Sequence, residues 1–507
     1  MKIIDKNKRF SESLLWKLQS DAYTNFGVEA WTEKGVPSYL TSNPYTAKQY
    51  AQAALGYLRD SVRRGAIDFS KPVYIFDLGA GTGRFGYLFL KHLLEWIEQL
   101  PLRNIQVRYV MTDMVEKNLA FLQSHPYLQD LIDHRYLDFA LYHHGYIEEP
   151  LVLRNTQEVL TPGSLQNPAI VIGNYFFDTI PQDLFKVQAG KLHEGRITIS
   201  SPIPYSETHP DPSIISGMEC RYDYVPIEDA SDYFPGNKDV NRLLHQYAAN
   251  FEGVPFLFPS GAFQTLDYFS RLSQNRYLML AGDQGVCTDK QVKEWGEPQI
   301  SRHGSFSISV SYHAIAEYFR MRGGTGLLTT LPDPLFVVIA AAADAPVEEM
   351  QELRFSFLQS FDSFEPSDYW KIVLCCEREW KTPPLDLLLL LIKIGNWDPI
   401  NFHAFFPAIH AQLPKASPQL RDDLCYTIDR VWQQFYPVSP QEGEFVMNLG
   451  VLLYEMEQPE KALVYFERAL KVAGDRADIW KNMGVCYAAL QDTENALACF
   501  QKAKSLK

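Results

Sequence analysis

The stretch YIFDLGAGTGRFG, residues 74–86, decides the fold of this chain. It starts with an apolar run that a single acid, Asp77, interrupts, and it continues with glycines at 79, 81, 83 and 86. An apolar run that ends in closely spaced glycines is typical of a buried strand, a tight turn and the start of a helix. Because glycine lets the backbone approach a ligand closely, we expect the turn to form part of a binding site.

The spacing of the glycines indicates which ligand this turn binds. A dinucleotide fingerprint has glycine at its first, third and sixth positions, but the sixth position counted from Gly79 is Arg84. A phosphate-binding P-loop ends in GKS or GKT, and the chain has GRF at that point. Asp77 would repel a polyphosphate and attract an ammonium group. The pattern therefore disfavours a nicotinamide oxidoreductase and predicts a positively charged ligand.

Short β-rich runs alternate with helical stretches upstream of residue 345. The runs are 73–78, 107–113, 169–178, 277–283 and 335–342. Between the first two, residues 86–100 carry apolar side chains every three or four positions, as an amphipathic helix does. This alternation predicts an α/β, Rossmann-like fold with a mostly parallel sheet. Residues from about 190 to 245, rich in proline, tyrosine and acids, interrupt the alternation and are expected to form an inserted cap.

Two similar segments, 448–470 and 482–504, lie near the C-terminus. Gly450 and Gly484 occupy equivalent positions in them, as do Phe466 and Phe500, and both pairs have the tetratricopeptide period of 34 residues. Small residues let paired helices approach, and aromatic residues fill the gaps between them. Since two repeats are seldom stable alone, we expect support from residues 346–440, a helical linker that can include degenerate repeats.

Composition excludes several classes of function. The length of 507 residues predicts about two to four domains. The net charge of −14 disfavours nucleic-acid and anionic-membrane binding, and we expect neither partner. The start, MKIIDKNKRF, has no apolar core typical of a signal peptide, and seven scattered cysteines without ligand spacing predict reduced thiols and no metal site. We therefore expect a cytoplasmic protein.

The stretch around the glycine turn resembles motif I of the class I S-adenosylmethionine-dependent methyltransferases, whose pattern DxGxGxG it matches without a gap. The resemblance implies that the cofactor is S-adenosyl-L-methionine and that Asp77 lies near its amino group. It also implies that Asp113 accepts hydrogen bonds from the ribose and that Asp138 lies near the adenine. The residues implied in cofactor binding are Asp77, Gly79, Ala80, Gly81, Gly83, Asp113, Asp138 and Asn174.

Residues 167–199 are similar to the MidA family of mitochondrial complex I assembly methyltransferases and their bacterial relatives. The family signature N-E-F-F-D-A-L-P and the hairpin after it match Asn174, Phe176, Phe177, Asp178, Pro181, Phe185, Val187, Gly190 and Glu194. Weaker similarities lie at 35–44, 278–285 and 305–324, so that the resemblance covers about residues 20 to 345. The chain departs from the signature at Tyr175, where the family has glutamate.

Methyl transfer to nitrogen requires a group that removes a proton or balances charge, and a carboxylate can do either. Asp178 is the candidate catalytic acid or base, with Asn174 as a second candidate that holds the cofactor or the incoming amine. An alternative role for Asp178 is to cap a helix that starts near Pro181. Asp283 and His313 are weaker candidates, because a single histidine on a helix is more often a core residue.

The predicted organisation has four parts. Residues 1–70 form a helical segment that completes the cofactor site, 71–345 the methyltransferase domain, 346–440 the helical linker and 441–507 the tetratricopeptide repeats. The predicted function is an S-adenosylmethionine-dependent methyltransferase that acts on an arginine or another nitrogen of a protein or peptide recruited by the repeats. The alternative is a cofactor-binding, catalytically weak scaffold or assembly factor, because Tyr175 replaces the acid of the signature.

Overall fold

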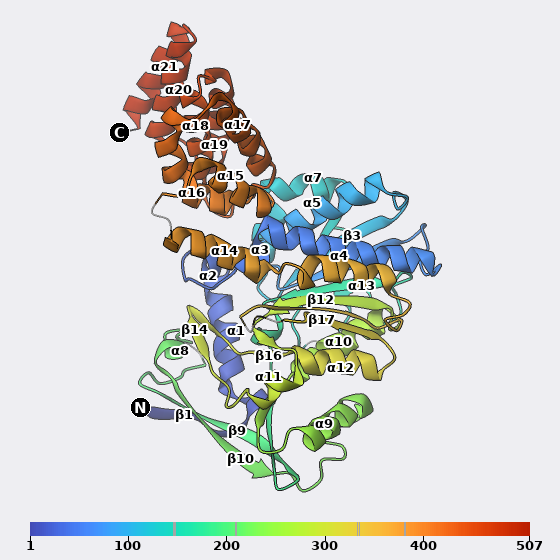
Figure 1. Cartoon of the computed structure of the whole chain (residues 1–507). Helices are drawn as coiled ribbons and strands as arrows, with labels where there is room; N and C mark the ends of the chain where they lie inside the picture. The colour runs from blue at the N-terminus through green and yellow to red at the C-terminus, as the bar shows by residue number, and fades with distance from the viewer. Residues whose placement is uncertain (146–148, 208–209, 332, 334, 380–381, 507) are drawn as a thin grey trace. The chain divides into compact units, whose positions relative to one another are not determined.

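In a computed structural model of the chain (Figure 1), the strand before the glycine turn, β2 (Pro72–Leu78), is an interior strand of a seven-stranded sheet, between β7 and β3. The strand order is β17-β18-β12-β7-β2-β3-β4. The bounds of the other six are β3 (Gln106–Asp113), β4 (Leu137–Leu141), β7 (Ala169–Asn174), β12 (Tyr277–Asp283), β17 (Thr325–Leu328) and β18 (Val337–Ala342). All pairings from β12 to β4 are parallel, while β18 is antiparallel to both of its neighbours.

The structure describes residues 1–145, 149–207, 210–331, 333, 335–379 and 382–506. The chain forms two compact units, one of Met1–Ser42 with Thr46–Ser367 and one of Asn43–Tyr45 with Asp368–Lys507. The first unit therefore continues to Ser367, beyond the position near 345 at which the alternating strand and helix pattern ends in the sequence.

Helices pack on both faces of the seven-stranded sheet (Figure 1). The glycine turn leads into α5 (Arg84–Gln99), where Phe89 packs against Tyr109 of β3 with ring centroids 5.6 Å apart. On the other face, Phe269 of α10 (Ser260–Leu272) packs against Phe76 at 5.1 Å. Successive residues of a strand point to opposite faces, so β2 is buried on both sides. This explains why its sequence is an almost uninterrupted apolar run.

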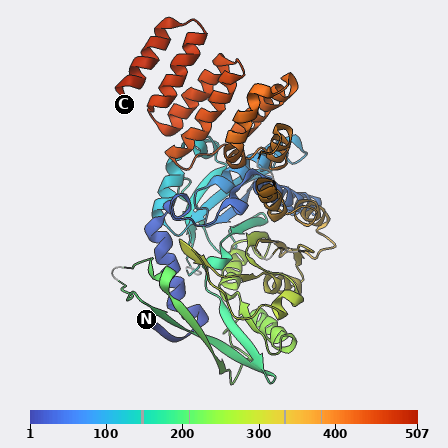
Figure 2. The same ribbon diagram turned by 60° about the vertical axis from the view of Figure 1, so that its left-hand side comes forward.

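The expected insertion forms a second sheet with the N-terminal strand (Figure 2). Its strands are β1 (Lys2–Arg9), β8 (Asp183–Gln188), β9 (Lys191–Ser201), β10 (Glu219–Pro226) and β11 (Pro255–Phe258), all paired antiparallel. Arg9 of β1 and Asp183 of β8 form a salt bridge of 2.7 Å. The inserted region is therefore wider than the range of about 190 to 245 expected from composition, and it includes a strand from the start of the chain.

Helices and short strands complete the first unit. The helices are α1 (Leu14–Phe26), α2 (Glu29–Thr32), α3 (Tyr39–Ser42), α4 (Pro44–Arg63), α6 (Glu116–Ser124), α7 (Gln129–Asp133), α8 (Ile214–Gly217), α9 (Lys238–Asn250), α11 (Asp289–Lys293), α12 (Tyr312–Met321) and α13 (Gln351–Phe357). The short strands are β5 (Leu151–Val152), β6 (Val159–Leu160), β13 (Gly285–Val286), β14 (Ser301–His303), β15 (Ser305–Ser307) and β16 (Val310–Ser311).

The second unit is helical. Its helices are α14 (Pro366–Glu379), α15 (Leu385–Ile394), α16 (Pro399–Gln412), α17 (Pro418–Gln433), α18 (Gly443–Glu455), α19 (Pro459–Ala473), α20 (Ala477–Ala489) and α21 (Thr493–Ser505). In each of the last two helix pairs a glycine lies against an aromatic ring. A Cβ atom would lie 2.7 Å from Phe466 at Gly450 and 2.6 Å from Phe500 at Gly484. The 34-residue period is thus a repeated helix–helix contact.

These observations confirm the predicted fold class, a Rossmann-like sheet with an inserted cap followed by an all-α helical-repeat region. Within the described residues, none of the helices combines the length and the apolar character needed to cross a membrane.

Candidate active site

A cavity of about 270 Å³ lies at the carboxyl ends of the central strands. The glycine turn, the ends of β3, β7 and β12, the loop after β4, residues 16–42 and the β14–β15 hairpin all contribute to its lining. The chain continues from β2 to β3 on one side and returns to β7 on the other, so the strand order reverses at this point of the sheet. In open α/β sheets, ligands bind at the carboxyl edge where the order reverses.

The glycines after β2 have backbone conformations that other residues rarely adopt. The φ angles are +66° at Gly79, +54° at Gly81 and +76° at Gly83. The turn is held by a hydrogen bond of 2.8 Å from the Ala80 amide to the Thr112 carbonyl. Gly79, Ala80 and Gly81 line the cavity. Gly83 is not among the described lining residues and instead precedes the first turn of α5.

Asp77, the acid of the central strand, is 4% exposed and lines the cavity. Its Oδ2 atom accepts no hydrogen bond from the described residues. Burial raises the pKa of this carboxyl to about 7. Gly86 of α5 makes room for it, since a Cβ atom there would lie 3.1 Å from Oδ2. Asp77 is thus a buried carboxyl in the cavity lining whose Oδ2 atom lies on the side of Gly86 and the Tyr109 ring.

Asp113, at the end of β3, also lines the cavity. Its Oδ2 atom accepts hydrogen bonds of 3.2 Å from the Gly81 amide and from the Asn118 side chain, and its Oδ1 atom accepts one of 2.9 Å from the Val115 amide. Burial nevertheless raises its pKa to about 6. Asp113 therefore connects the glycine turn after β2 to the loop after β3.

Among the acids predicted to bind the cofactor, Asp138 alone is not among the described residues that line the cavity. It is fully buried. Its carboxylate accepts hydrogen bonds of 2.8 Å from the Asn155 amide and of 2.7 Å from the Thr156 hydroxyl. Asp138 thus holds the loop after β5, and the expected contact with adenine is corrected to a structural role. The described lining residues on this side are Tyr142, His143 and His144.

The side chain of Asn174, the last residue of β7, faces the cavity. Both polar atoms of its amide are buried and have no hydrogen-bond partner among the described residues. The next residue, Tyr175, has a φ of +48°, which a tyrosine rarely adopts, and its amide donates a hydrogen bond of 3.0 Å to the Gly282 carbonyl. Backbone strain of this kind is concentrated at functional sites.

Asp178 and Asp283 form a buried carboxyl pair at the cavity. The Asp178 amide donates a hydrogen bond of 3.1 Å to Oδ2 of Asp283, and Oδ1 of Asp178 is buried without a partner among the described residues. Burial raises the pKa of both carboxyls, that of Asp178 to about 6. The alternative role of Asp178 as a helix cap is wrong, because it lies in a 3-10 turn (Phe177–Thr179) that leads into the strand β8.

The lining includes groups that the sequence analysis did not identify. Residues 16–42 contribute Trp16, Tyr23 and Trp31, and a Cβ atom on Gly81 would lie 3.0 Å from the Trp31 ring. The β14–β15 hairpin contributes His303 and Ser307. An acid at the end of a parallel strand is a signal that could have given Asp283 more weight, but no local pattern marks the aromatic residues or the hairpin.

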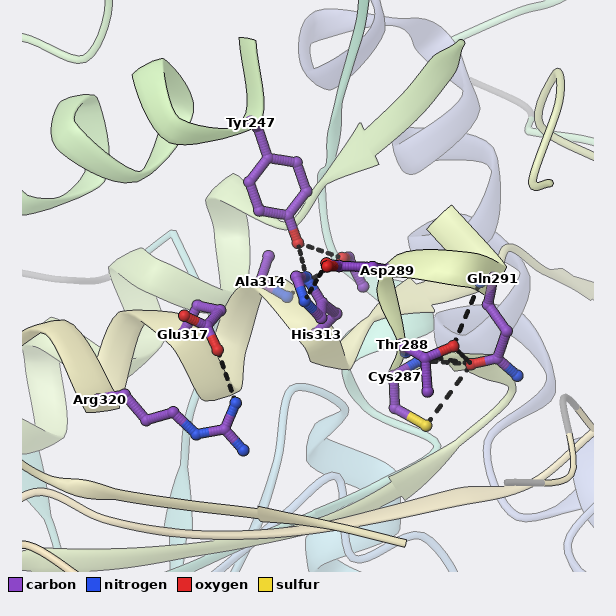
Figure 3. A network of polar contacts seen from close by, with 10 residues as sticks. Tyr247, Cys287, Thr288, Asp289, Gln291, His313, Ala314, Glu317 and Arg320 are labelled. Carbon is purple, nitrogen blue, oxygen red and sulfur yellow. Dashed lines mark hydrogen bonds and ion pairs between the residues drawn. The ribbon is translucent and has the colours of Figure 1, made fainter. Parts of the chain in front are cut away.

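His313 is held outside the cavity lining in a polar network that joins three helices (Figure 3). Its Nδ1 atom lies 2.6 Å from the Tyr247 hydroxyl of α9, and its Nε2 atom lies 3.0 Å from Oδ1 of Asp289 in α11. Burial lowers the pKa of this histidine. The contacts agree with the interpretation of His313 as a structural residue.

The cavity lining is acidic and aromatic. Among the described residues that form it, there are four aspartates and there is no lysine or arginine. The aspartates are Asp77, Asp113, Asp178 and Asp283. Such a lining is complementary to a ligand that carries positive charge and apolar surface. In the described part of the chain, no group of three or more histidine, cysteine, aspartate or glutamate side chains could hold a metal ion.

Comparison with solved structures found weak similarities. The chain is 13% identical to a methyl transferase candidate from Burkholderia thailandensis bound to S-adenosyl-homocysteine, with a TM-score of 0.38, covering 66% of this chain and 95% of that one. It is 11% identical to the carbon methyltransferase CurJ, with a TM-score of 0.25, covering 59% of this chain and 57% of that one. A search of curated protein sequences found no match.

The C-terminal region also matches family models. Residues 444–476 and 477–507 each match a tetratricopeptide repeat model. The two matches coincide with the helix pairs α18–α19 and α20–α21, in which the glycine and aromatic contact recurs. The end of the second unit is thus similar to tetratricopeptide repeats in sequence and in structure, as the 34-residue period predicts.

Proposed function

We propose that the chain is an S-adenosyl-L-methionine-dependent methyltransferase that acts on a nitrogen of a protein or peptide. The observation that carries this proposal is the cavity itself, where a glycine turn and the carboxyls of Asp77 and Asp113 meet at the switch point of the sheet. The match to motif I in the sequence supports the same cofactor. The cofactor carries an ammonium and a sulfonium, and the described lining contains four aspartates and no lysine or arginine.

The residues present fit this cofactor. The turn at Gly79–Gly81 carries no side chain larger than the Ala80 methyl group, and the Asp77 carboxyl, which lines the cavity, would pair with an ammonium group. Asp113 would accept hydrogen bonds from ribose hydroxyls, and the amide of Asn174, which has no partner among the described residues, would hold the amino-acid end. When bound, the cofactor would supply an electrophilic methyl group. The protein would then contribute alignment and the exclusion of water.

The acceptor side of the cavity favours a nitrogen nucleophile. Asp178 lines the cavity together with Asn174, and one of its carboxyl oxygens has no partner among the described residues. A nitrogen that gains a methyl group must lose a proton, and a carboxyl with a pKa of about 6 can accept one near neutral pH. The helical repeats support a macromolecular acceptor, because repeat surfaces of this kind bind extended peptides.

Calorimetric titration of the full chain with S-adenosylhomocysteine tests the proposal. Gly81→Ala should weaken binding by at least about tenfold, because a Cβ atom at this positive φ would meet Trp31. Gly190→Ala is the matched control, since Gly190 has a φ of +72° with no atom within 4 Å of its Cβ position and is not among the described lining residues. The control should bind as the wild type does. If the wild type does not bind S-adenosylhomocysteine, the proposal is wrong.

Transfer of a labelled methyl group in cell lysate separates catalysis from binding. The methyltransferase should label a protein fraction in a reaction that Gly81→Ala slows. Binding without transfer to any fraction would instead favour the scaffold, for which the tyrosine at position 175 remains the supporting observation.

A further inference from the structure

The indole ring of Trp31 covers part of the glycine turn. A Cβ atom on Gly81 would lie 3.0 Å from Cη2 and 3.1 Å from Cζ2 of this ring, so the ring lies in close contact with the backbone of the turn. The same ring stacks on Tyr23 of α1, with centroids 5.9 Å apart and an angle of 27° between the planes. Both aromatic residues line the cavity. A ligand that approaches Gly81 from this side must therefore displace Trp31.

The segment that carries Trp31 is short and weakly held. It consists of residues 27–35 and contains the one-turn helix α2 (Figure 1). Of the four described residues of α2, only Ala30 is buried. Trp31 is half-buried, and residues 32–35 are exposed to solvent. The segment thus lies between the cavity and solvent, and few buried contacts oppose its local opening.

The two ends of the segment are held differently. Gly27, with a φ of +58°, is packed against α6, because a Cβ atom there would overlap the side chain of Lys117. Gly35, with a φ of +76°, has no atom within 4 Å of its Cβ position. Next to it, the Lys34 carbonyl rests against Gly304 of the β14–β15 hairpin. Since glycine changes its backbone angles at little cost, Gly35 is suited to be a hinge, whereas Gly27 is anchored.

We propose that residues 28–34 form a lid that turns about Gly35, and that Trp31 leaves Gly81 whenever the cofactor enters or departs. In the closed position, which the structure shows, the ring covers the turn and retains a bound molecule. Lids of this kind move through a few residues that absorb the change in backbone angles. The role in cofactor exchange rests on the proposed function, whereas the opening of the lid does not.

Fluorine nuclear magnetic resonance of the free full-length protein, labelled with 5-fluorotryptophan, tests the opening. The Trp31 resonance is the one that Trp31→Phe removes. It should exchange with a minor, solvent-exposed state, seen as a second resonance or as relaxation dispersion. A Trp31 resonance that shows neither would overturn the proposal.

Gly35→Ala tests the hinge. Alanine at a φ of +76° is strained in the closed position and relieved when the lid turns, so the open population should rise about fivefold. Gly65→Ala is the matched control, because Gly65 is also exposed, has a φ of +67° and has no atom within 4 Å of its Cβ position. It should leave the Trp31 resonance unchanged. Equal effects of the two variants, or no effect of Gly35→Ala, would overturn the proposed hinge.

The exchange of S-adenosylhomocysteine on the immobilised full chain, measured by surface plasmon resonance, tests the role in binding. Trp31→Ala should raise both kon and koff by at least about fivefold, because a site that is open for a fraction of the time binds at a rate reduced by that fraction. A residue that only contacts the ligand changes koff alone, so an unchanged kon would overturn the gating role. Trp96→Ala is the control and should keep both rates, since Trp96 of α5 stacks on His92 and is not among the described lining residues.

The lid and the proposed function can fail separately. If the wild type binds no S-adenosylhomocysteine, the proposed function is rejected. The fluorine measurement still decides whether the lid opens, because it uses the free protein.

Discussion

Asp77 shows how the position of a residue in the sheet can shift the pKa of its side chain. It lies on a central strand that is covered on both faces, and Gly86 of α5 lets the helix pack directly over it. A carboxyl in such a place prefers to be neutral in the free protein. A bound ammonium group would favour the charged form instead. The same residue therefore links the stability of the fold to the occupancy of the site.

The pH dependence of Asp77 gives a first prediction. Burial raises the pKa of Asp77 in the folded protein to about 7, above the ordinary value of 3.8. Between these two pH values the carboxyl is therefore protonated in the folded protein and ionised in the unfolded chain. The free energy of unfolding should consequently fall as pH rises from about 4 to about 7. Asp77→Asn should reduce this slope in thermal melts of the full chain. Asp267→Asn, at a half-buried position on α10, is the control and should keep the slope.

Cofactor affinity should have the opposite pH dependence, and this is a second prediction. Binding of the ammonium group requires ionised Asp77, so the affinity for S-adenosylhomocysteine should rise by up to about tenfold per pH unit below pH 7 and level off above it. Calorimetry between pH 5 and 8 measures this profile. A flat profile would mean that Asp77 does not contact the ligand, and Asp77→Asn should bind weakly at every pH.

Asp178 gives the third prediction, which concerns catalysis alone. Asp178→Asn should lower kcat by at least about 100-fold, because the variant cannot accept the proton of the nitrogen, while it keeps the affinity for S-adenosylhomocysteine within about twofold. Single-turnover transfer and calorimetry provide the two readouts. Equal activity in the variant and the wild type would remove Asp178 from the mechanism.

At the scale of elements, the repeats depend on one recurring contact. In α18–α19 and in α20–α21, a glycine of the first helix lies against a phenylalanine of the second, and the two contacts are one period apart. Because the glycine has no side chain, the helices approach closely and the ring fills the space between them. The sequence shows the period, and the structure shows that it corresponds to this packing.

Overpacking of the second repeat is the fourth prediction. Gly484→Val should destabilise α20–α21 by about 1–3 kcal/mol, because its Cβ atom would lie 2.6 Å from the Phe500 ring. Faster hydrogen exchange of these two helices in the full chain measures the effect. Phe500→Leu combined with Gly484→Val should restore part of the protection, since the two residues share one contact. Additive effects in the double variant would contradict the packing explanation.

At the scale of the whole molecule, the proposed function requires a recognition surface apart from the cavity. The last repeats contain a hollow of about 620 Å³, with Lys471, Trp480, Tyr487 and Asn495 among its lining residues. Aromatic and amide side chains of this kind can hold an extended peptide. Recruitment by this hollow would act on the acceptor and leave cofactor binding unchanged.

The fifth prediction tests this separation of roles. Combining Lys471→Glu with Tyr487→Ala should lower kcat/KM for a macromolecular acceptor by at least about tenfold, with unchanged affinity for S-adenosylhomocysteine. Lys481→Glu is the control with the same charge change, because Lys481 is exposed and is not among the described residues that line the hollow. Equal loss in the control, or no loss in the double variant, would show that the hollow does not recruit the acceptor.

The sequence by itself determined the central strand, the glycine turn, the alternation that builds the sheet, and the repeats. Each of these is a local pattern in which backbone conformation and burial follow from residues a few positions apart. The resemblance to motif I and to the N-E-F-F-D-A-L-P signature also indicated Asp77, Asp113, Asn174 and Asp178, all of which line the cavity.

Only the tertiary structure decided which other groups join them. Asp138 lies near the start of β4 and not at its end, it is bound to the loop after β5, and it is absent from the described cavity lining. Asp283 pairs with Asp178 across 105 residues of sequence, and His303 and Ser307 line the same cavity from a hairpin that no local pattern marks. The reason is that a side chain's protonation depends on burial and on neighbours brought together by distant parts of the chain, which no local pattern in the sequence encodes.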